Sequence, residues 1–425
     1  MSDSIRFSSR RDVLKGGILA ASAPGLLRGS PADKAIRVGL VGCGGRGTGA
    51  AAQALKADDY SELTAVADVY RERIDDCLAR LKRVSAAKVK VDPDRMFVGL
   101  DAYRKLIESD VDVVLLATPP GFRPEHLRTA IEANKHVFCE KPVAVDAPGV
   151  RDVLESVQLA QARNLSLVAG FCWRYSNYIR AAFDQIQNGA IGDIVSYYGT
   201  YYTNPVKPMP PESTRPAGMS DVEWQICNWY NFVWTCGDGL VEQAVHSVDK
   251  VAWAFGDKPP VSCVAVGGRQ IPAHGGNIYD HFEINYLYPN NVRAFLGCRQ
   301  MEGCYNENSD YIAGAKGVCT IGRGPMPRID GQTNWKFEGT KNDMYQAEHD
   351  VLFASIRQGK PVNDGERMAT STLLAIMGRM AAYTGQQVTW EQVLNSQERI
   401  FPEKIDWDMS LPVAPMARPG ITKLL

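Results

Sequence analysis

The chain has 425 residues, of which 45% are hydrophobic and 22% are charged, and its formal net charge at pH 7 is −1. This length and composition predict two domains of ordinary globular character. The absence of a basic run in the sequence argues against nucleic acid or an anionic membrane surface as the partner. No stretch beyond residue 30 is long and apolar enough to span a bilayer, so we expect no membrane anchor in the mature protein.

The N-terminal segment has the pattern of an export signal. Residues 9–15 read SRRDVLK, and the paired Arg10 and Arg11 precede an uncharged stretch, 16–27. Paired arginines before a short apolar stretch are typical of the twin-arginine route. We therefore expect residues 1–32 to be a signal peptide and the protein to be periplasmic or otherwise exported. A disordered cytoplasmic tail is the alternative.

The sequence contains ten cysteines, with no CxxC pair and no zinc-ligand spacing. A chain of this size does not need disulfides for stability, and several of the cysteines lie inside apolar runs. We expect them to be reduced and mostly buried, and we expect no metal site.

From residue 36 onward, short apolar runs alternate with amphipathic helical patterns. The runs are 36–41, 63–67, 111–117, 136–139 and 165–170, and helical patterns between them cover 48–56, 70–84 and 124–134. Continuous apolar strands separated by helices predict an α/β domain with a doubly wound parallel sheet.

The first run ends at a glycine-rich turn, GCGGRG, in which Gly42, Gly44 and Gly47 follow the G-x-G-x-x-G pattern. In a dinucleotide-binding unit these glycines permit the tight turn, the approach of backbone to the pyrophosphate, and close helix–strand packing. The following helix N-terminus favours the anionic phosphates. Asp68, at the end of the second run, would bind ribose hydroxyls and repel a 2′-phosphate, which favours NAD, whereas Arg71 leaves NADP open.

A lysine follows the fourth run almost directly, in the sequence CEKPV at 139–143. Carboxyl ends of parallel strands meet at one edge of a sheet, so Lys141 should lie where nicotinamide and substrate meet. An ammonium there can stabilise the alkoxide that develops as a hydride leaves. A solvated surface lysine is the alternative.

The segment 237–256 predicts a helix with Glu242 and His246 four residues apart on one face. A carboxylate that orients an imidazole is typical of general base chemistry near neutral pH. Asp249 follows about one turn later and is a candidate substrate contact. A packed or exposed histidine without a catalytic role is the alternative.

The later chain predicts a second sheet and two further helices. Strand patterns cover 261–270, 281–288, 291–300 and 317–322, and helical patterns cover 343–358 and 366–383. Several of these strands alternate apolar and polar residues, as strands of an antiparallel sheet with one open face do.

A proline-rich stretch, 204–218, precedes five aromatic residues. These are Trp224, Trp229, Tyr230, Phe232 and Trp234. Their rings would form either a platform for a sugar or the packing of a long loop onto the sheet. Arg174 and Tyr175 are further polar candidates for the substrate cleft, and a structural role is the alternative for each.

Four motifs in this order resemble the glucose-fructose oxidoreductase, inositol dehydrogenase and MocA family, or Gfo/Idh/MocA. They are GCGGRG, ATPP at 117–120, EKP at 140–142 and the helix around His246. The resemblance implies a Rossmann domain, which we place at 33–160, and an α/β domain with a large, open, mostly antiparallel sheet at 161–425. It also implies C-terminal helices packed near the first domain and a homo-oligomer, either a dimer or a tetramer.

The resemblance also implies roles for individual residues. Lys141 matches the family's lysine and His246 its proton-transferring histidine, while Glu242 stands where simple dehydrogenases of the family carry aspartate. The expected cofactor contacts are Gly42, Gly44, Gly45, Arg46, Gly47, Asp68, Thr118, Pro119, Glu140 and Lys141. The expected substrate contacts are Arg174, Tyr175, Trp229, Tyr230 and Asp249.

Together these features predict an NAD(P)-dependent oxidoreductase for a sugar, a polyol or a related carbohydrate. An exported enzyme has no supply of fresh cofactor, so we expect tightly held NAD that is recycled within the active site. The first alternative is an NAD-dependent glycoside hydrolase that works by transient C3 oxidation, elimination, hydration and re-reduction, with Tyr175, Tyr230 or Glu242 as a second base. The second alternative is a non-catalytic sugar-binding or sensor protein.

Overall fold

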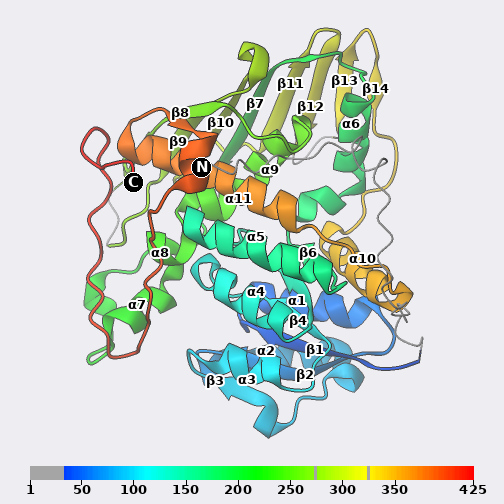
Figure 1. Cartoon of the computed structure of the whole chain (residues 1–425), viewed down its shortest axis with the longest axis vertical. Helices are drawn as coiled ribbons and strands as arrows, with labels where there is room; N and C mark the ends of the chain where they lie inside the picture. Colours follow the sequence, from blue (N-terminus) through cyan, green and yellow to red (C-terminus); the bar gives the residue numbers. More distant parts are fainter. Residues whose placement is uncertain (1–32, 272–274, 323–325) are drawn as a thin grey trace, which may run out of the picture.

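The computed structural model describes residues 33–271, 275–322 and 326–425, so the predicted signal peptide, residues 1–32, lies outside the described residues. The described chain forms a six-stranded sheet and a nine-stranded sheet, with helices between and around them (Figure 1). The first sheet is parallel and the second is mostly antiparallel. The predicted α/β fold class, a Rossmann domain followed by a domain with a large open sheet, is confirmed.

The first sheet has the strand order of a doubly wound domain. From one edge to the other, its strands are β3 (Met96–Val98), β2 (Ser61–Asp68), β1 (Ile36–Val41), β4 (Val113–Leu116), β5 (His136–Cys139) and β6 (Leu167–Ala169). Since β6 pairs with β5, this sheet extends past the expected domain boundary at residue 160. The carboxyl ends of β1, β4 and β5 meet at one edge, where the order reverses around β1.

Both faces of the first sheet are buried, because successive side chains enter two different hydrophobic clusters. In β4, Val113 and Leu115 belong to one cluster and Val114 and Leu116 belong to the other. Helices from both halves of the chain cover the two faces. The first face carries α1 (Gly45–Ala57), α2 (Arg71–Ser85) and α10 (Met344–Gln358), and the second carries α3 (Ala102–Glu108), α4 (Arg123–Glu132) and α5 (Ala147–Ala162).

Helix α10 comes from the C-terminal half of the chain but completes the core of the first domain (Figure 1). Leu352 and Phe353 are fully buried in the same cluster as the side chains of β1. The Arg357 guanidinium pairs with the Asp58 carboxylate at 2.7 Å, which fixes the end of α10 against the end of α1.

The second sheet is built around strand β7, which the sequence patterns did not predict. Its strands in order are β14 (Trp335–Lys336), β13 (Arg328–Gly331), β12 (Gly317–Gly322), β11 (Ser309–Gly314), β7 (Ile194–Thr203), β10 (Arg293–Gln300), β9 (His281–Leu287), β8 (Ser262–Gly268) and β15 (Val388–Thr389). The β7–β10 pair is parallel, and the other recorded pairs are antiparallel.

Helices cover one face of this sheet. The remaining helices are α6 (Asn177–Gln187), α7 (Asp221–Cys227), α8 (Val233–Cys236), α9 (Val245–Ala254), α11 (Gly365–Thr384) and α12 (Trp390–Asn395), and a π-helical turn, Leu240–Ala244, leads directly into α9. Short 3₁₀ turns cover 86–88, 93–95, 120–122, 172–175, 212–214, 229–231 and 289–291.

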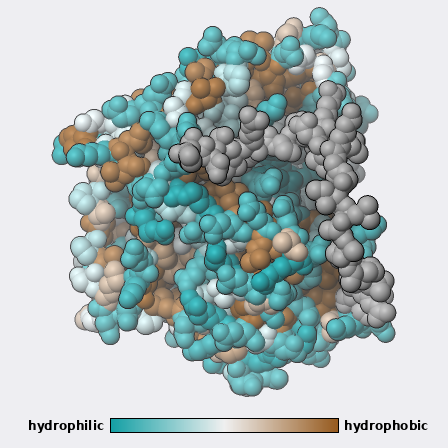
Figure 2. Space-filling model, viewed as in Figure 1, coloured by the Kyte–Doolittle hydropathy of each residue, from teal (hydrophilic) through white to brown (hydrophobic). Residues whose placement is uncertain are grey.

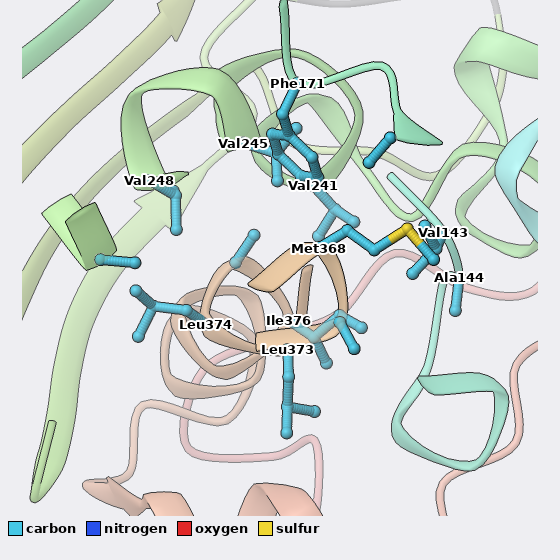
Figure 3. Close-up of a cluster of buried hydrophobic side chains, with 14 of the residues drawn as sticks. Val143, Ala144, Phe171, Val241, Val245, Val248, Met368, Leu373, Leu374 and Ile376 are labelled. Atoms are coloured by element: carbon cyan, nitrogen blue, oxygen red, sulfur yellow. The ribbon is translucent and has the colours of Figure 1, made fainter. Parts of the chain in front are cut away.

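The long helix α11 lies at the centre of the molecule and is almost entirely buried. Its residue Met368 lies beside Val241 of the π-helical turn and Leu374 lies on the side of Val248 of α9, whereas Leu373 points away from them (Figure 3). This packing fixes the segment that carries the two predicted catalytic residues of the second domain.

All ten cysteines lie within the described residues and are free thiols, and eight of them are buried. None of the helices in the described ranges combines the length and apolar character needed to cross a bilayer. The face shown in Figure 2 is mostly hydrophilic, with hydrophobic residues in separate patches.

Candidate active site

A cavity of about 490 Å³ lies at the carboxyl edge of the first sheet and is lined by both domains. It brings together every predicted cofactor-binding and catalytic residue and two predicted substrate contacts. These are Gly42, Gly44, Gly45, Arg46, Gly47, Asp68, Thr118, Pro119, Glu140, Lys141, Trp229, Tyr230, Glu242 and His246.

The glycine-rich turn is shaped for a ligand that approaches the backbone. A Cβ on Gly44 or Gly45 would meet no protein atom within 4 Å, whereas one on Gly47 would lie 1.8 Å from the Gly42 carbonyl oxygen. Gly42 has a φ of +96°, which favours glycine. No described side chain caps the N-terminus of α1 at Gly45, so its first N–H groups are available to an anion.

Asp68, at the end of β2, holds the turn and also faces the cavity. Its Oδ2 accepts a hydrogen bond from the Cys43 N–H at 2.7 Å, and its Oδ1 accepts one from the Tyr70 N–H at 3.1 Å. Each carboxylate oxygen keeps a further acceptor site, which a ribose hydroxyl can use. The residues of the turn and Asp68 therefore fit a nicotinamide dinucleotide.

Arg46 lines the cavity, but its positive charge is balanced by the protein. Its guanidinium pairs with Glu140 and, at 3.1 Å, with Glu348 of α10. Burial opposes the charge, but these two carboxylates raise the pKa of Arg46 above its ordinary value. Arg46 therefore ties the turn to β5 and α10 instead of offering an uncompensated cation to a phosphate.

Lys141 and Glu242 meet across the domain boundary. The Lys141 ammonium donates to the backbone carbonyl of Glu242 and to its Oε1, at 3.2 Å. Both side chains are almost fully buried. The second carboxylate oxygen, Oε2, has no hydrogen-bond partner among the described residues.

The predicted hydrogen-bonded dyad of Glu242 and His246 is not formed. The Glu242 carboxylate turns to Lys141, because a full positive charge attracts it more strongly than a neutral imidazole. The His246 Nδ1 has no partner within the described part of the chain, and the ring lies 5.2 Å from that of Trp173. Burial, and then the positive charge of Lys141, lower the pKa of His246 well below its usual value, so the imidazole is neutral near pH 7.

Of the five aromatic residues in 224–234, two line the cavity and three are packed away from it. Trp229 and Tyr230 line the cavity and contact each other edge to face, with ring centroids 5.3 Å apart. The Tyr230 hydroxyl accepts a hydrogen bond from the Gln300 amide at 3.2 Å. The other three aromatics, Trp224, Phe232 and Trp234, pack in a separate hydrophobic cluster.

Three predicted substrate contacts lie outside the cavity lining, which corrects the expectation for them. Arg174 and Asp249 form a buried ion pair with two contacts of 2.8 Å, so each satisfies the other. Tyr175 is also buried and donates to Asp364. Their partners come from distant parts of the chain, and these bonds hold packed elements together.

The cavity also contains polar residues that were not predicted, including Arg73, Lys207 and Gln243. Arg73 lies in α2 and Lys207 in the proline-rich stretch, and only the folded chain brings them together. A lysine within a proline-rich loop was the one signal in the sequence for Lys207. Among the described residues no cluster of three or more His, Cys, Asp or Glu side chains is arranged to hold a metal ion.

A Rossmann sheet whose phosphate-binding turn shares a cavity with a buried lysine and a neutral histidine defines the class of dinucleotide-dependent oxidoreductases. Two protein-family models match the chain. The one described as "Oxidoreductase family, NAD-binding Rossmann fold" matches residues 36–171, and the one described as "Oxidoreductase family, C-terminal alpha/beta domain" matches residues 184–389. The chain belongs to the Gfo/Idh/MocA family of oxidoreductases, as its motifs suggested.

Inositol 2-dehydrogenase from Acidothermus cellulolyticus is 26% identical over 249 residues, which make up 58% of this chain and 61% of that protein. The chain spans about half to two thirds of the length of the curated relatives that it matches. Two solved structures share the fold with a TM-score of 0.66 over 84% of this chain. They are levoglucosan dehydrogenase in complex with NADH and levoglucosan (19% identity, 99% of that chain) and aldose-aldose oxidoreductase from Caulobacter crescentus complexed with glycerol (18%, 100%).

Proposed function

We propose that this protein is an NAD(P)-dependent oxidoreductase that acts on a sugar, a polyol or a related carbohydrate. The observation that carries the proposal is one cavity that joins the glycine-rich turn to Lys141, Glu242 and His246. The matched relatives named for inositol and levoglucosan support a polyhydroxylated substrate.

The geometry supports a different role in the reaction for each of His246, Lys141 and Glu242. His246 is neutral near pH 7 and lines the cavity, so its imidazole can accept the proton of the reacting hydroxyl. Lys141 stabilises the negative charge that develops on the hydroxyl oxygen. Glu242 holds the ammonium in place through Oε1. The nicotinamide, when bound, accepts the hydride or returns it.

Two aromatic side chains support carbohydrate binding. The rings of Trp229 and Tyr230 in the cavity wall offer apolar faces to the C–H groups of a sugar, beside the polar groups that bind its hydroxyls. Asp68 supports NAD over NADP, because its carboxylate repels a 2′-phosphate.

We further propose that the cofactor is retained and reduced again within the same site. The predicted export of the protein supports this proposal, because an exported enzyme carries its cofactor from the cytoplasm. Hydride removed from one substrate then returns to a second carbonyl compound. The name of the Caulobacter crescentus relative, aldose-aldose oxidoreductase, is consistent with such an exchange.

A glycoside hydrolase is the second candidate, favoured by the buried, unpartnered Oε2 of Glu242. Elimination after C3 oxidation requires a second base at C2, and the Glu242 side chain lines the same cavity as His246. Tyr230 is the less suitable base, because burial, and then the negative charge of Glu242, raise its pKa well above the usual value and leave the hydroxyl protonated near neutral pH.

We also propose that the open face of the second sheet forms a homo-oligomer contact. The strand register places Tyr198, Tyr311, Val318, Val264 and Val266 on this face. All five are exposed, with Val266 at 69%. Light scattering of the purified protein tests this contact, and a monomer contradicts it.

The deciding experiment is to purify the protein, denature it and measure released nicotinamide dinucleotide by chromatography. About one NAD(H) per chain supports retention, and a panel of glycosides and free sugars then separates hydrolysis from oxidation. An empty protein that oxidises sugars only with added NAD supports an exchanging dehydrogenase. Binding of sugar without turnover, unchanged in a His246→Ala variant, supports a binding protein.

A further inference from the structure

The second domain contributes a segment that lies over the glycine-rich turn. Lys207 and Trp229 line the main cavity, and with Gly44, Gly45 and Arg73 they also line a second cavity of about 300 Å³. Residues 204–234, termed the roof segment here, therefore cover the place where the phosphates of a dinucleotide would meet the turn.

Lys207 and Arg73 are cations without an anionic partner in the described chain. The Lys207 ammonium donates to the Cys227 carbonyl at 2.6 Å, and Arg73 lies 5.0 Å from the centroid of the Tyr70 ring. Burial, and then the positive charge of Arg73, lower the pKa of Lys207. Two mutually repelling cations beside a phosphate-binding turn fit an anion bound between them.

The roof segment is held by a hydrophobic cluster built from three parts of the chain. Its buried members are Met209, Val222, Trp224, Ile226, Phe232 and Trp234, all from the roof segment. Side chains after the strand ends of the first domain, such as Tyr70 and Phe122, pack against them. The tail, defined here as residues 396–411, also packs against these buried side chains, through Phe401 and Trp407.

The tail is fixed to both domains. The Ile400 and Phe401 N–H groups donate to Asp146 Oδ2 of the first domain at 2.8 and 3.2 Å, and the Leu411 N–H donates to Asp221 Oδ2 of the roof segment at 3.2 Å. The Phe401 ring lies 5.1 Å from that of Phe122. In Figure 1 the tail runs beside α7 and α8. Lifting the roof segment from the turn therefore strains contacts along the tail.

We propose that the roof segment retains the dinucleotide: Lys207, together with Arg73, binds its phosphates, and the tail latches the roof segment closed so that release is slow. This inference rests on the proposed function, because it requires a site that binds NAD(P). The tail lies beyond residues 36–171 and 184–389, which the two family models match.

The test measures NADH binding and dissociation by fluorescence for the full chain and two variants. Lys207→Met should weaken NADH binding about tenfold, through faster dissociation and with a smaller dependence on salt, because one charge-assisted phosphate contact is lost. Trp407→Ala should speed both association and dissociation about tenfold with little change in Kd, since it loosens the latch without touching the ligand. Lys90→Met and Val413→Ala replace exposed residues outside the cluster and should behave as the wild type.

Equal dissociation rates in the wild type, Lys207→Met and Trp407→Ala would overturn the inference while leaving NAD(P) binding intact. A wild type that binds neither NADH nor NADPH would overturn the proposed function as well. Should Trp407→Ala fail to fold, Phe401→Leu keeps the side-chain volume and weakens the aromatic contacts of the latch. Faster NADH dissociation from Phe401→Leu than from the wild type then supports the inference, and an equal rate overturns it.

Discussion

Two glycines of the same turn should respond to alanine in opposite ways. In Gly47→Ala the new methyl would lie 1.8 Å from the Gly42 carbonyl oxygen, far inside the roughly 3.5 Å at which nonbonded atoms pack. Relieving this clash requires the turn or α1 to move by more than about 1 Å. Overpacking of this kind costs about 1–3 kcal/mol of the free energy of unfolding, and it distorts the phosphate site.

In Gly44→Ala the protein itself should tolerate the methyl. Gly44 has φ −69° and ψ −174°, which any residue adopts, and its Cβ would meet no protein atom within 4 Å. The thermal midpoint should therefore be unchanged or slightly higher. The methyl enters the space through which the pyrophosphate approaches, so loss of one or two charge-assisted contacts should weaken NADH binding about ten- to a hundredfold.

The assay pairs thermal unfolding without cofactor with NADH titration by fluorescence. Gly47→Ala should lose both stability and binding, while Gly44→Ala should lose binding alone. A Gly44→Ala variant that binds NADH as tightly as the wild type would refute the assignment of this cavity as the dinucleotide site.

Three further predictions concern titratable side chains. Replacing His246 by alanine should lower kcat about 10²–10⁴-fold and leave the Kd of NADH nearly unchanged, and equal turnover would show that His246 is not the base. The pKa of His246 lies well below its usual value, so the neutral imidazole persists as pH falls. The kcat/KM for oxidation should therefore stay level from pH 8 to pH 6, and an inflection near pH 6.5 would contradict this. Burial raises the pKa of Asp238 from 3.8 to about 6, so the folded state binds its proton more tightly than the unfolded state does. The bound proton therefore contributes fully to the free energy of unfolding at low pH, and this contribution falls by roughly 3 kcal/mol as pH rises through 6. The thermal midpoint of Asp238→Asn should therefore rise relative to that of the wild type between pH 4 and pH 7. Parallel plots of the two midpoints against pH would exclude the effect.

Five of the six strands of the first sheet could be predicted, because they are buried on both faces and their sequences are continuously apolar, whereas the short and partly exposed edge strand β3 was missed. Strand β7 was missed although its sequence, IVSYYGTYYT, is rich in the β-branched and aromatic residues that favour strands, because it has neither a continuous aliphatic run nor a regular apolar–polar alternation. Its partners β10 and β11 begin at Arg293 and Ser309, about 100 residues later, so the pairing has no local signature.

The candidate site was predictable to the extent that topology alone places residues. Strand ends in a parallel sheet share one edge, which is why Asp68, Thr118 and Lys141 line one cavity. The choice of partners was not predictable. Lys141 meets Glu242 across 101 residues of sequence, and Arg174 is neutralised by Asp249 in the core rather than offered to a substrate.

The position of α10 has a consequence for biosynthesis. Helices α1 and α2 cover part of one face of the first sheet, and this cover is complete only when Leu352 and Phe353 of α10 pack there and Glu348 pairs with Arg46. The ribosome makes these residues about 300 residues after the glycine-rich turn. The nucleotide site is therefore completed only after α10 has been made, and we expect a dinucleotide to bind after that point rather than to guide the folding of the first domain during synthesis.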